Sequence, residues 1–140
     1  MSRFTTQRIL RFGDCDPAGI AYFPSYFHFL NGVVEEWWET LGFPWRQLFQ
    51  ERRIGLPTVQ LDTQFLAPGF LGDRLTFSFE IASLGSRSMT LQHQIQRDGT
   101  LLWRATQVVV ATSLDTHHSI AWPDDMRAAI QCFQEAPAHV

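Results

Sequence analysis

The spacing of apolar residues changes once along the chain, close to residue 56. Before this point, apolar side chains recur every three or four positions, at Phe27, Leu30, Val34, Trp37, Trp38 and Leu41. This spacing is typical of one face of an α-helix. Pro24 is favourable in the first turn of a helix, and Gly42 and Pro44 indicate where the helix ends. The pattern therefore predicts one long helix of about 17 residues, followed by a short helical turn over residues 45–51.

After residue 56 polar and apolar residues alternate, which is the pattern of strands with one buried face. The alternation covers three segments, residues 59–65, 75–81 and 89–95, and a fourth β-prone segment over residues 101–112 has apolar residues on both faces, as expected for a central strand. Turn residues separate these segments, and the Asp98-Gly99 pair is a strong hairpin signal. A further strand is expected within residues 5–12, and a terminal helix over residues 124–133.

The order of elements is a strand, a long helix and four further strands in a meander. A helix this apolar must be covered, and an antiparallel sheet curled around it is the simplest cover. We therefore expect an α+β fold of one domain over residues 1–140, with one long central helix wrapped by a five-stranded antiparallel sheet. Such a sheet has two open edges, and pairing with a second copy of the chain would extend it and hide one of them.

The amino-acid composition and net charge exclude several classes of protein. A chain of 140 residues with 45% hydrophobic and 18% charged residues is typical of one globular domain. The net charge of -3 argues against a general nucleic-acid binder. No apolar run approaches the roughly 20 residues of a membrane helix. Residues 1–11 lack the apolar stretch of a signal peptide, so a cytoplasmic location is expected.

The absence of lysine and the presence of only two cysteines exclude several catalytic mechanisms and structural frameworks. All 11 basic residues are arginine, which excludes a Walker-A loop and a Schiff-base mechanism because both need a lysine. Cys15 and Cys132 give no disulfide framework, and the histidines show no metal-ligand spacing, so no metal site is expected. The 12 Phe and 5 Trp residues indicate a large core, or an apolar binding surface or subunit interface.

The most unusual segment is the loop of residues 12–24, which leads directly into the predicted helix. It places Asp14 and Asp16 among glycines and a proline, next to a helix N-terminus. Unpaired N–H groups and the helix dipole favour negative charge at such a position. An aspartate there can attack a carbonyl or activate water. The alternative is that both aspartates only cap turns, where this residue is common.

The run Asp16-Pro17-Ala18-Gly19-Ile20, followed by Tyr22, Pro24 and Tyr26, resembles the active-site segment of the 4-hydroxybenzoyl-CoA thioesterase family. The same run is similar, more loosely, to the acyl-CoA thioesterases associated with the Tol–Pal system. The likeness extends from Arg8 to about Phe133. That family has the hotdog fold, a long helix wrapped by an antiparallel sheet, in agreement with the element order expected here.

The resemblance implies hydrolysis of an acyl-CoA thioester to a free acid and coenzyme A. No cofactor is implied, because coenzyme A is part of the substrate. Asp16 matches the family's catalytic carboxylate, acting as nucleophile or as general base on water. The N–H of Phe23 matches the group that polarises the thioester carbonyl. The family's site lies across a dimer interface, so a homodimer or a tetramer of dimers is expected.

Two positions depart from the family pattern. Phe23 stands where the 4-hydroxybenzoyl enzyme has an aromatic hydroxyl, and Asn31 stands where it has a carboxylate. Asn31 is kept as a candidate catalytic residue because its amide still forms hydrogen bonds. Both changes favour an aromatic or a short to medium apolar acyl group over a phenolic one. Glu35, one helical turn beyond Asn31, faces either the same cavity or solvent.

Gly19, Tyr22, Arg87 and Ser88 are further positions that the resemblance places at the substrate. Arg87 follows a hairpin turn that meets the coenzyme A nucleotide in related enzymes, and a guanidinium suits a phosphate. The alternative is an arginine that faces only solvent. His93, on an apolar strand face, is interpreted as a hydrogen-bonded core residue.

Other functions remain open at this point. A hotdog dehydratase or hydratase normally uses a histidine near the helix, where this chain has Asp16. A non-catalytic module that binds acyl-CoA or an acyl-carrier protein is the remaining alternative. An aspartate beside a helix N-terminus favours hydrolysis over both. The sequence identifies neither the acyl group nor the choice between a covalent anhydride and base-catalysed attack by water.

Overall fold

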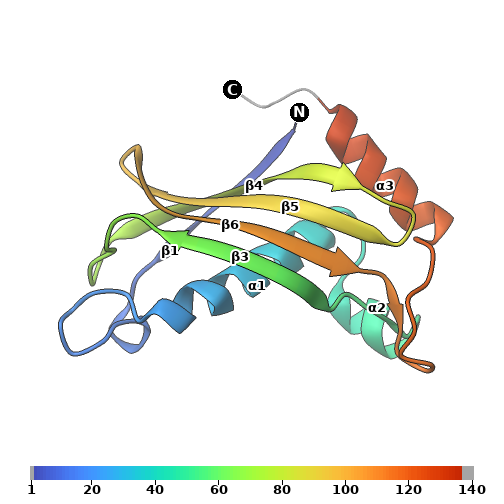
Figure 1. Ribbon diagram of the computed structural model, residues 1–140, viewed down its shortest axis with the longest axis horizontal. Helices are drawn as coiled ribbons and strands as arrows, with labels where there is room; N and C mark the ends of the chain where they lie inside the picture. Colours follow the sequence, from blue (N-terminus) through green and yellow to red (C-terminus); the bar gives the residue numbers. More distant parts are fainter. Residues whose placement is uncertain (1, 137–140) are drawn as a thin grey trace.

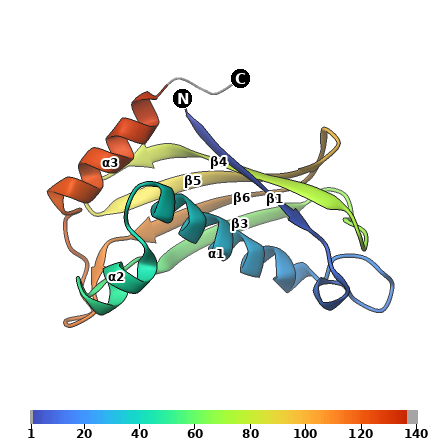
Figure 2. The ribbon, with the colours of Figure 1, turned by 180° about the vertical axis from the view of Figure 1, so that it is seen from behind.

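The computed structural model describes residues 2–136; Met1 and residues 137–140 of the predicted 1–140 domain lie outside the described part. Five antiparallel strands form a curved sheet, and one long helix crosses one of its faces (Figures 1 and 2). The strands are β1 (Arg3–Ile9), β3 (Thr58–Phe65), β4 (Arg74–Leu84), β5 (Ser88–Arg97) and β6 (Thr100–Val110). The helices are α1 (Phe23–Thr40), α2 (Trp45–Gln50) and α3 (Asp124–Glu135). The predicted α+β class, with a helix wrapped by a five-stranded antiparallel sheet, is confirmed.

The strand order differs from the predicted meander. The order is β1-β4-β5-β6-β3, so only β4, β5 and β6 are neighbours in sequence order. β3 lies beside β6 at the far edge, because the chain crosses the sheet as α1 and α2 before β3 begins (Figure 2). Residue alternation carries no information on which strands pair, so this part of the prediction was wrong.

The core lies between α1 and the inner face of the sheet. The buried residues of α1 are Tyr26, Leu30, Val33, Val34, Trp37 and Trp38. Trp37 packs edge-on against Phe79 of β4, with ring centroids 5.3 Å apart. Trp37 and Trp38 are both fully buried, so they pack in the core. Burial of this face fixes how α1 lies on the sheet.

Several short elements were not predicted. Residues Phe12–Asp14 form one turn of 3₁₀-helix, and β2 (Ile54–Gly55) pairs with β7 (Thr112–Ser113). These pieces are too short to show any periodicity. No helix among residues 2–136 has the length and apolar character that a bilayer crossing requires.

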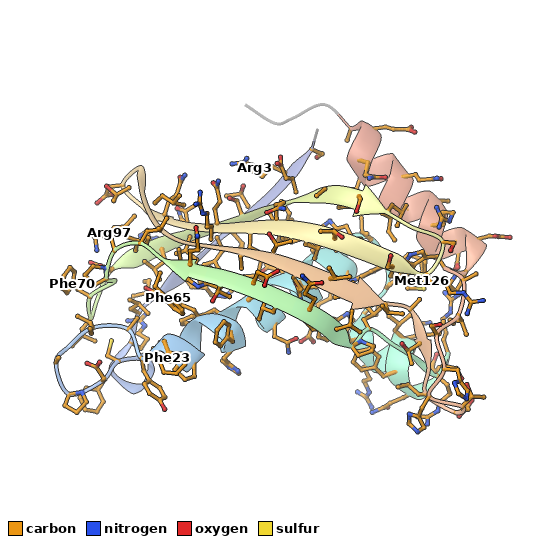
Figure 3. All side chains as sticks on the ribbon, in the orientation of Figure 1. Arg3, Phe23, Phe65, Phe70, Arg97 and Met126 are labelled. Carbon is orange, nitrogen blue, oxygen red and sulfur yellow. The ribbon has the colours of Figure 1, made fainter. Side chains whose placement is uncertain are left out.

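The two ends of the sheet carry different segments. The loop of residues 11–22 lies at one end, and α3 lies at the other (Figure 1). Figure 3 shows the same division, with Phe23, Phe65, Phe70 and Arg97 at the loop end and Met126 at the α3 end.

Candidate active site

Asp14 holds the start of the loop of residues 11–22. Its carboxylate accepts the N–H of Arg11 at 2.9 Å, and its backbone carbonyl accepts the N–H of Tyr22 at 2.9 Å. These two bonds close the loop at both of its ends. Asp14 therefore caps a turn, which is one of the two roles that the sequence left open for it.

Asp16 lies in the middle of the same loop and is half-buried. One carboxylate oxygen accepts the N–H of Ala18 at 2.8 Å, and the Asp16 N–H donates to the carbonyl of Ile20 at 2.9 Å. Gly19 has φ +79°, which favours glycine, and its N–H donates to the Asp16 carbonyl at 2.9 Å. Among the described residues, Asp16 forms no ion pair, so its second carboxylate oxygen remains available to a ligand or water.

The N-terminus of α1 is uncapped. Tyr22 is the N-cap residue and provides no side-chain hydrogen bond to the first turn. The N–H of Phe23 has no acceptor among residues 2–136, and Pro24 has no N–H to donate. Since an 18-residue helix presents its positive end here, the Phe23 N–H is suited to a developing oxyanion.

A cavity of about 310 Å³ lies beside this helix terminus. Its lining is mostly apolar and comprises Ile20, Ala21, Phe23, Tyr26, Phe65, Leu66, Ala67, Pro68 and Gly69. Asp16 does not line the cavity, but its backbone is hydrogen-bonded to Ile20, which does. Phe23 and Phe65 leave about half of their surface exposed at its mouth, at 57% and 50%. The cavity therefore offers an apolar surface at the helix terminus that carries the free Phe23 N–H, and it shares Ile20 with the backbone hydrogen bonds of Asp16.

Two ionisable groups near the cavity stay neutral. Burial raises the pKa of the Tyr26 hydroxyl, and the nearby Gly69 backbone and Arg97 oppose this shift only in part. Gly69 lies close to that hydroxyl but outside hydrogen-bond geometry, so the hydroxyl has no partner among the described residues. Burial raises the pKa of Cys15 as well, with smaller contributions from Asp14 and Asp16. A protonated thiol is a poor nucleophile, which leaves the carboxylate of Asp16 as the candidate group.

Asn31 does not meet Asp16 within one chain. It lies eight residues after Phe23 on α1, about 12 Å further along the axis at 1.5 Å per residue. It lines a second apolar cavity of about 350 Å³ with Trp45, Phe49, Gly55, Leu56, Pro57 and Leu114. Glu35, whose orientation the sequence left open, is half-buried and does not line this cavity.

Arg87 and Ser88 lie at the α3 end of the sheet. β4 runs 11 residues from the loop end to the turn that precedes them, a span of more than about 30 Å. The exposed guanidinium of Arg87 donates to the carbonyl of Ser119 at 2.7 Å and to its hydroxyl at 3.2 Å. The carbonyl of Ser88 accepts the indole N–H of Trp122 at 3.1 Å. A single chain therefore brings together Asp16, Gly19, Tyr22 and Phe23, and places Asn31, Arg87 and Ser88 elsewhere.

The sequence reasoning assigned no role to the loop of residues 66–73, which packs against the loop of residues 11–22. The N–H of Ala21 donates to the carbonyl of Gly69 at 2.9 Å, and the N–H of Leu71 donates to the carbonyl of Gly19 at 3.0 Å. The turn residues Pro68-Gly69 and Gly72-Asp73 marked this loop in the sequence, but nothing there indicated what it contacts.

A family model described as the thioesterase-like superfamily matches residues 10–130 of the chain. The chain is 34% identical to 4-hydroxybenzoyl-CoA thioesterase from Pseudomonas sp. (strain CBS-3) over 113 residues, covering 76% of this chain and 80% of that enzyme.

Two solved structures are also similar. A 1,4-dihydroxy-2-naphthoyl-CoA thioesterase from Synechocystis is 25% identical, with a TM-score of 0.87 and coverage of 97% of this chain and 100% of that chain. An aspartate-to-asparagine mutant of 4-hydroxybenzoyl-CoA thioesterase, in complex with 4-hydroxybenzoyl-CoA, is 29% identical, with a TM-score of 0.85 and coverage of 93% and 99%. These likenesses extend over nearly all of the described residues, and the fold is the predicted hotdog fold.

Proposed function

Since the chain belongs to the thioesterase-like superfamily, we propose that Asp16 and the N-terminus of α1 hydrolyse an acyl-CoA thioester to a free acid and coenzyme A. The chain is a thioester hydrolase, as its relatives are. The observation that supports the roles of these residues is one juxtaposition. A carboxylate with a free oxygen lies in the loop that ends at an uncapped helix terminus, beside an apolar cavity.

Each part has a separate task in the proposed reaction. The Phe23 N–H and the helix dipole stabilise negative charge on the thioester oxygen as the carbonyl carbon is attacked. Removal of one such donor typically costs about 10²–10³ in rate. Asp16 either attacks the carbonyl to give a mixed anhydride, which water then hydrolyses to the free acid and the original carboxylate, or removes a proton from a water that attacks the carbonyl directly. The thiolate leaves without strong acid assistance, so the reaction as proposed uses no metal and no cofactor beyond the substrate's own coenzyme A.

We further propose that each site uses two copies of the chain. Asn31, Arg87 and Ser88 lie far from Asp16 in one chain, so a shared site requires a neighbouring subunit to supply them. Within residues 2–136, β3 pairs with β6 alone, which leaves its outer edge open to a second copy. Val59 of β3 is 61% exposed, and Phe65 and Leu66 are about half exposed. Apolar side chains on an open edge strand favour burial against another subunit.

The acyl group in this proposal is aromatic or apolar and of short to medium length. Both cavities are lined mainly by apolar side chains, and Phe23 and Asn31 provide no charge. Gly19 and Tyr22 contribute through the loop and helix terminus, where the thioester would lie. Arg87 and Ser88 would meet the nucleotide of coenzyme A from a neighbouring subunit. The cytoplasmic location expected from the sequence stays a prediction.

Thiol release from a panel of acyl-CoAs tests the proposal, with Asp16→Asn compared against Asp14→Asn. Asp16→Asn keeps the size of the side chain but removes its charge, so kcat should fall by at least about 10²-fold. Asp14→Asn retains an oxygen that accepts the Arg11 N–H, so its kcat should stay close to that of the wild type. Near-native turnover in a folded Asp16→Asn protein would falsify the role of Asp16. Acyl-CoA binding without thiol release by the wild type would indicate a binding module instead.

A further inference from the structure

The position of the Asp16 loop depends on the loop of residues 66–73. Two backbone hydrogen bonds join the loops, from Ala21 to Gly69 and from Leu71 to Gly19. An isolated bridge between Ile20 and Phe70 lies between these two bonds. Any shift of the loop of residues 66–73 would therefore move the segment that follows Asp16 and leads to Phe23.

Arg97, the last residue of β5, holds the loop of residues 66–73 in place. Its Nη1 lies 2.7 Å from a carboxylate oxygen of Asp73 and 3.1 Å from the carbonyl oxygen of Pro68. The same Asp73 oxygen accepts the N–H of Phe70 at 2.8 Å. The guanidinium carbon of Arg97 lies 5.4 Å from the centre of the Phe70 ring, within the range of a cation–π contact. One side chain thus holds both ends of the segment 68–73.

The pair is shielded from water. The Arg97 and Asp73 side chains are only 25% and 22% exposed, so solvent screens their attraction less than at an open surface. Burial by itself disfavours the charged carboxylate, but hydrogen bonds from Phe70 and Arg97, with the Arg97 charge, hold the pKa of Asp73 below its usual value. Asp73 is therefore ionised at neutral pH and available to hold Arg97.

We propose that Arg97 is a positioning residue for the hydrolysis: by fixing the loop of residues 66–73, it fixes Asp16 relative to the Phe23 N–H. This inference rests on the function proposed above. A displacement of about 1 Å at a reacting group can cost about 10² in rate, even when the altered residue is distant from the chemistry. Arg97 touches neither Asp16 nor Phe23, so its effect passes through backbone bonds between the two loops.

The ion pair between Arg52 and Asp125 is the control. Its two hydrogen bonds measure 2.7 and 3.0 Å, and the Arg52 and Asp125 side chains are 31% and 58% exposed. It joins the residues after α2 to the start of α3, at the opposite end of the sheet from the Asp16 loop (Figure 1). Loss of this pair removes a hydrogen-bonded arginine–carboxylate pair, more exposed than that of Arg97 and Asp73, without reaching the loops.

The first test compares the kinetics and the stability of Arg97→Gln with those of Arg52→Gln. Arg97→Gln should lower kcat by about 10–100-fold, with KM changed by less than about threefold. Arg97→Lys should recover most of this loss, because an ammonium can donate to both Asp73 and Pro68. Arg52→Gln should leave kcat unchanged. Asp73→Asn, which keeps an acceptor for the Phe70 N–H, provides a second variant with the same expected loss in kcat.

The second test places Arg97→Gln in the Asp16→Asn background. If Arg97 acts through Asp16, the two losses are not additive, and Arg97→Gln should have almost no further effect in the double variant. An undiminished loss in the double variant, or wild-type kcat in both Arg97→Gln and Asp73→Asn, overturns the proposal. Wild-type kcat in Asp16→Asn alone overturns the proposed function, and with it the role of Arg97. The single Asp16→Asn variant therefore distinguishes the two failures.

Discussion

Inside the core, Nε2 of His93 lies 2.8 Å from Oε1 of Gln107. The amide nitrogen of Gln107 donates in turn to the hydroxyl of Thr58 at 2.9 Å, which links β5, β6 and β3. Only 4% of His93 and 4% of Gln107 is exposed. The sequence interpretation of His93 as a hydrogen-bonded core residue is confirmed. A histidine buried as the neutral form makes stability depend on pH.

Stability is expected to fall as the pH is lowered below the ordinary range of histidine. Burial lowers the pKa of His93 from 6.5 to about 4, and the Gln107 hydrogen bond opposes this only in part. Between these two values the unfolded chain binds a proton that the folded protein excludes. The free energy of unfolding should therefore fall by up to about 3 kcal/mol from this group as the pH falls from 6.5 to 4. Above pH 6.5 the group adds no pH dependence.

Urea unfolding at several pH values measures this effect. His93→Gln keeps an amide donor for Gln107 but does not titrate, so its stability should fall less between pH 6.5 and 4 than that of the wild type. Equal slopes in the wild type and His93→Gln would contradict the prediction.

Gly69→Ala should destabilise the protein through a steric clash. An added Cβ would lie 2.6 Å from the hydroxyl oxygen of Tyr26 and 2.9 Å from a methyl carbon of Leu10. Because φ of Gly69 is not positive, space and not backbone conformation restricts this position. Overpacking of this kind typically costs about 1–3 kcal/mol.

Tyr26→Phe provides the control for Gly69→Ala. The Tyr26 hydroxyl is buried and has no hydrogen-bond partner in the described part of the chain, so its removal should leave stability unchanged or raise it slightly. In the Tyr26→Phe background, Gly69→Ala should cost less, since one of the two close contacts is gone. Thermal or urea unfolding of the four proteins measures the difference. An equal cost in both backgrounds would show that the hydroxyl is not the obstacle.

The fold class and the long helix could be predicted from the sequence, but the pairing of the strands and the contacts between the loops could not. The helix over Phe23–Thr40 was predicted because its burial on one face imposes a three- and four-residue spacing. The position of β3 beside β6 was not, because alternation shows which face a strand buries but not its neighbour. Likewise the loop and the family resemblance pointed to Asp16 as a candidate, whereas the contacts of Arg97 with Pro68 and Asp73 join residues far apart in sequence. Long-range contacts of this kind leave no local pattern.

The active unit is expected to be at least a dimer that pairs through β3. Val59→Lys places a charge on the exposed part of this edge strand, and should lower both the molecular mass seen by light scattering and kcat. Thr5→Lys, on the opposite edge strand β1, is the control and should preserve both. An active wild-type monomer would contradict the proposal that each active site is shared between two subunits.

Arg87→Ala should weaken substrate binding more than it slows chemistry. If Arg87 meets the nucleotide of coenzyme A, which is distant from the scissile bond, KM should rise while kcat changes little. A truncated thioester without the nucleotide should be hydrolysed equally well by both proteins. The contacts of Arg87 with Ser119 provide the competing explanation. Under that explanation the two substrates are affected equally. Arg104→Ala removes an exposed arginine of β6 that is hydrogen-bonded to Gln64, and it shows the effect of losing an arginine elsewhere on the sheet.

The last prediction concerns the acyl group. Asn31 lines an apolar cavity and supplies no charge, so benzoyl-CoA and other apolar acyl-CoAs should have higher kcat/KM than 4-hydroxybenzoyl-CoA. Asn31→Asp introduces an acceptor for a phenolic hydroxyl. Because a hydrogen bond to a charged group contributes about 1.5–3 kcal/mol, this variant should shift the ratio of kcat/KM toward the phenolic substrate by on the order of tenfold or more. Gln47→Glu adds the same charge on α2 outside the cavity and should leave the ratio unchanged. A wild-type enzyme that strongly prefers 4-hydroxybenzoyl-CoA would refute the assignment of the pocket while leaving the hydrolase activity intact.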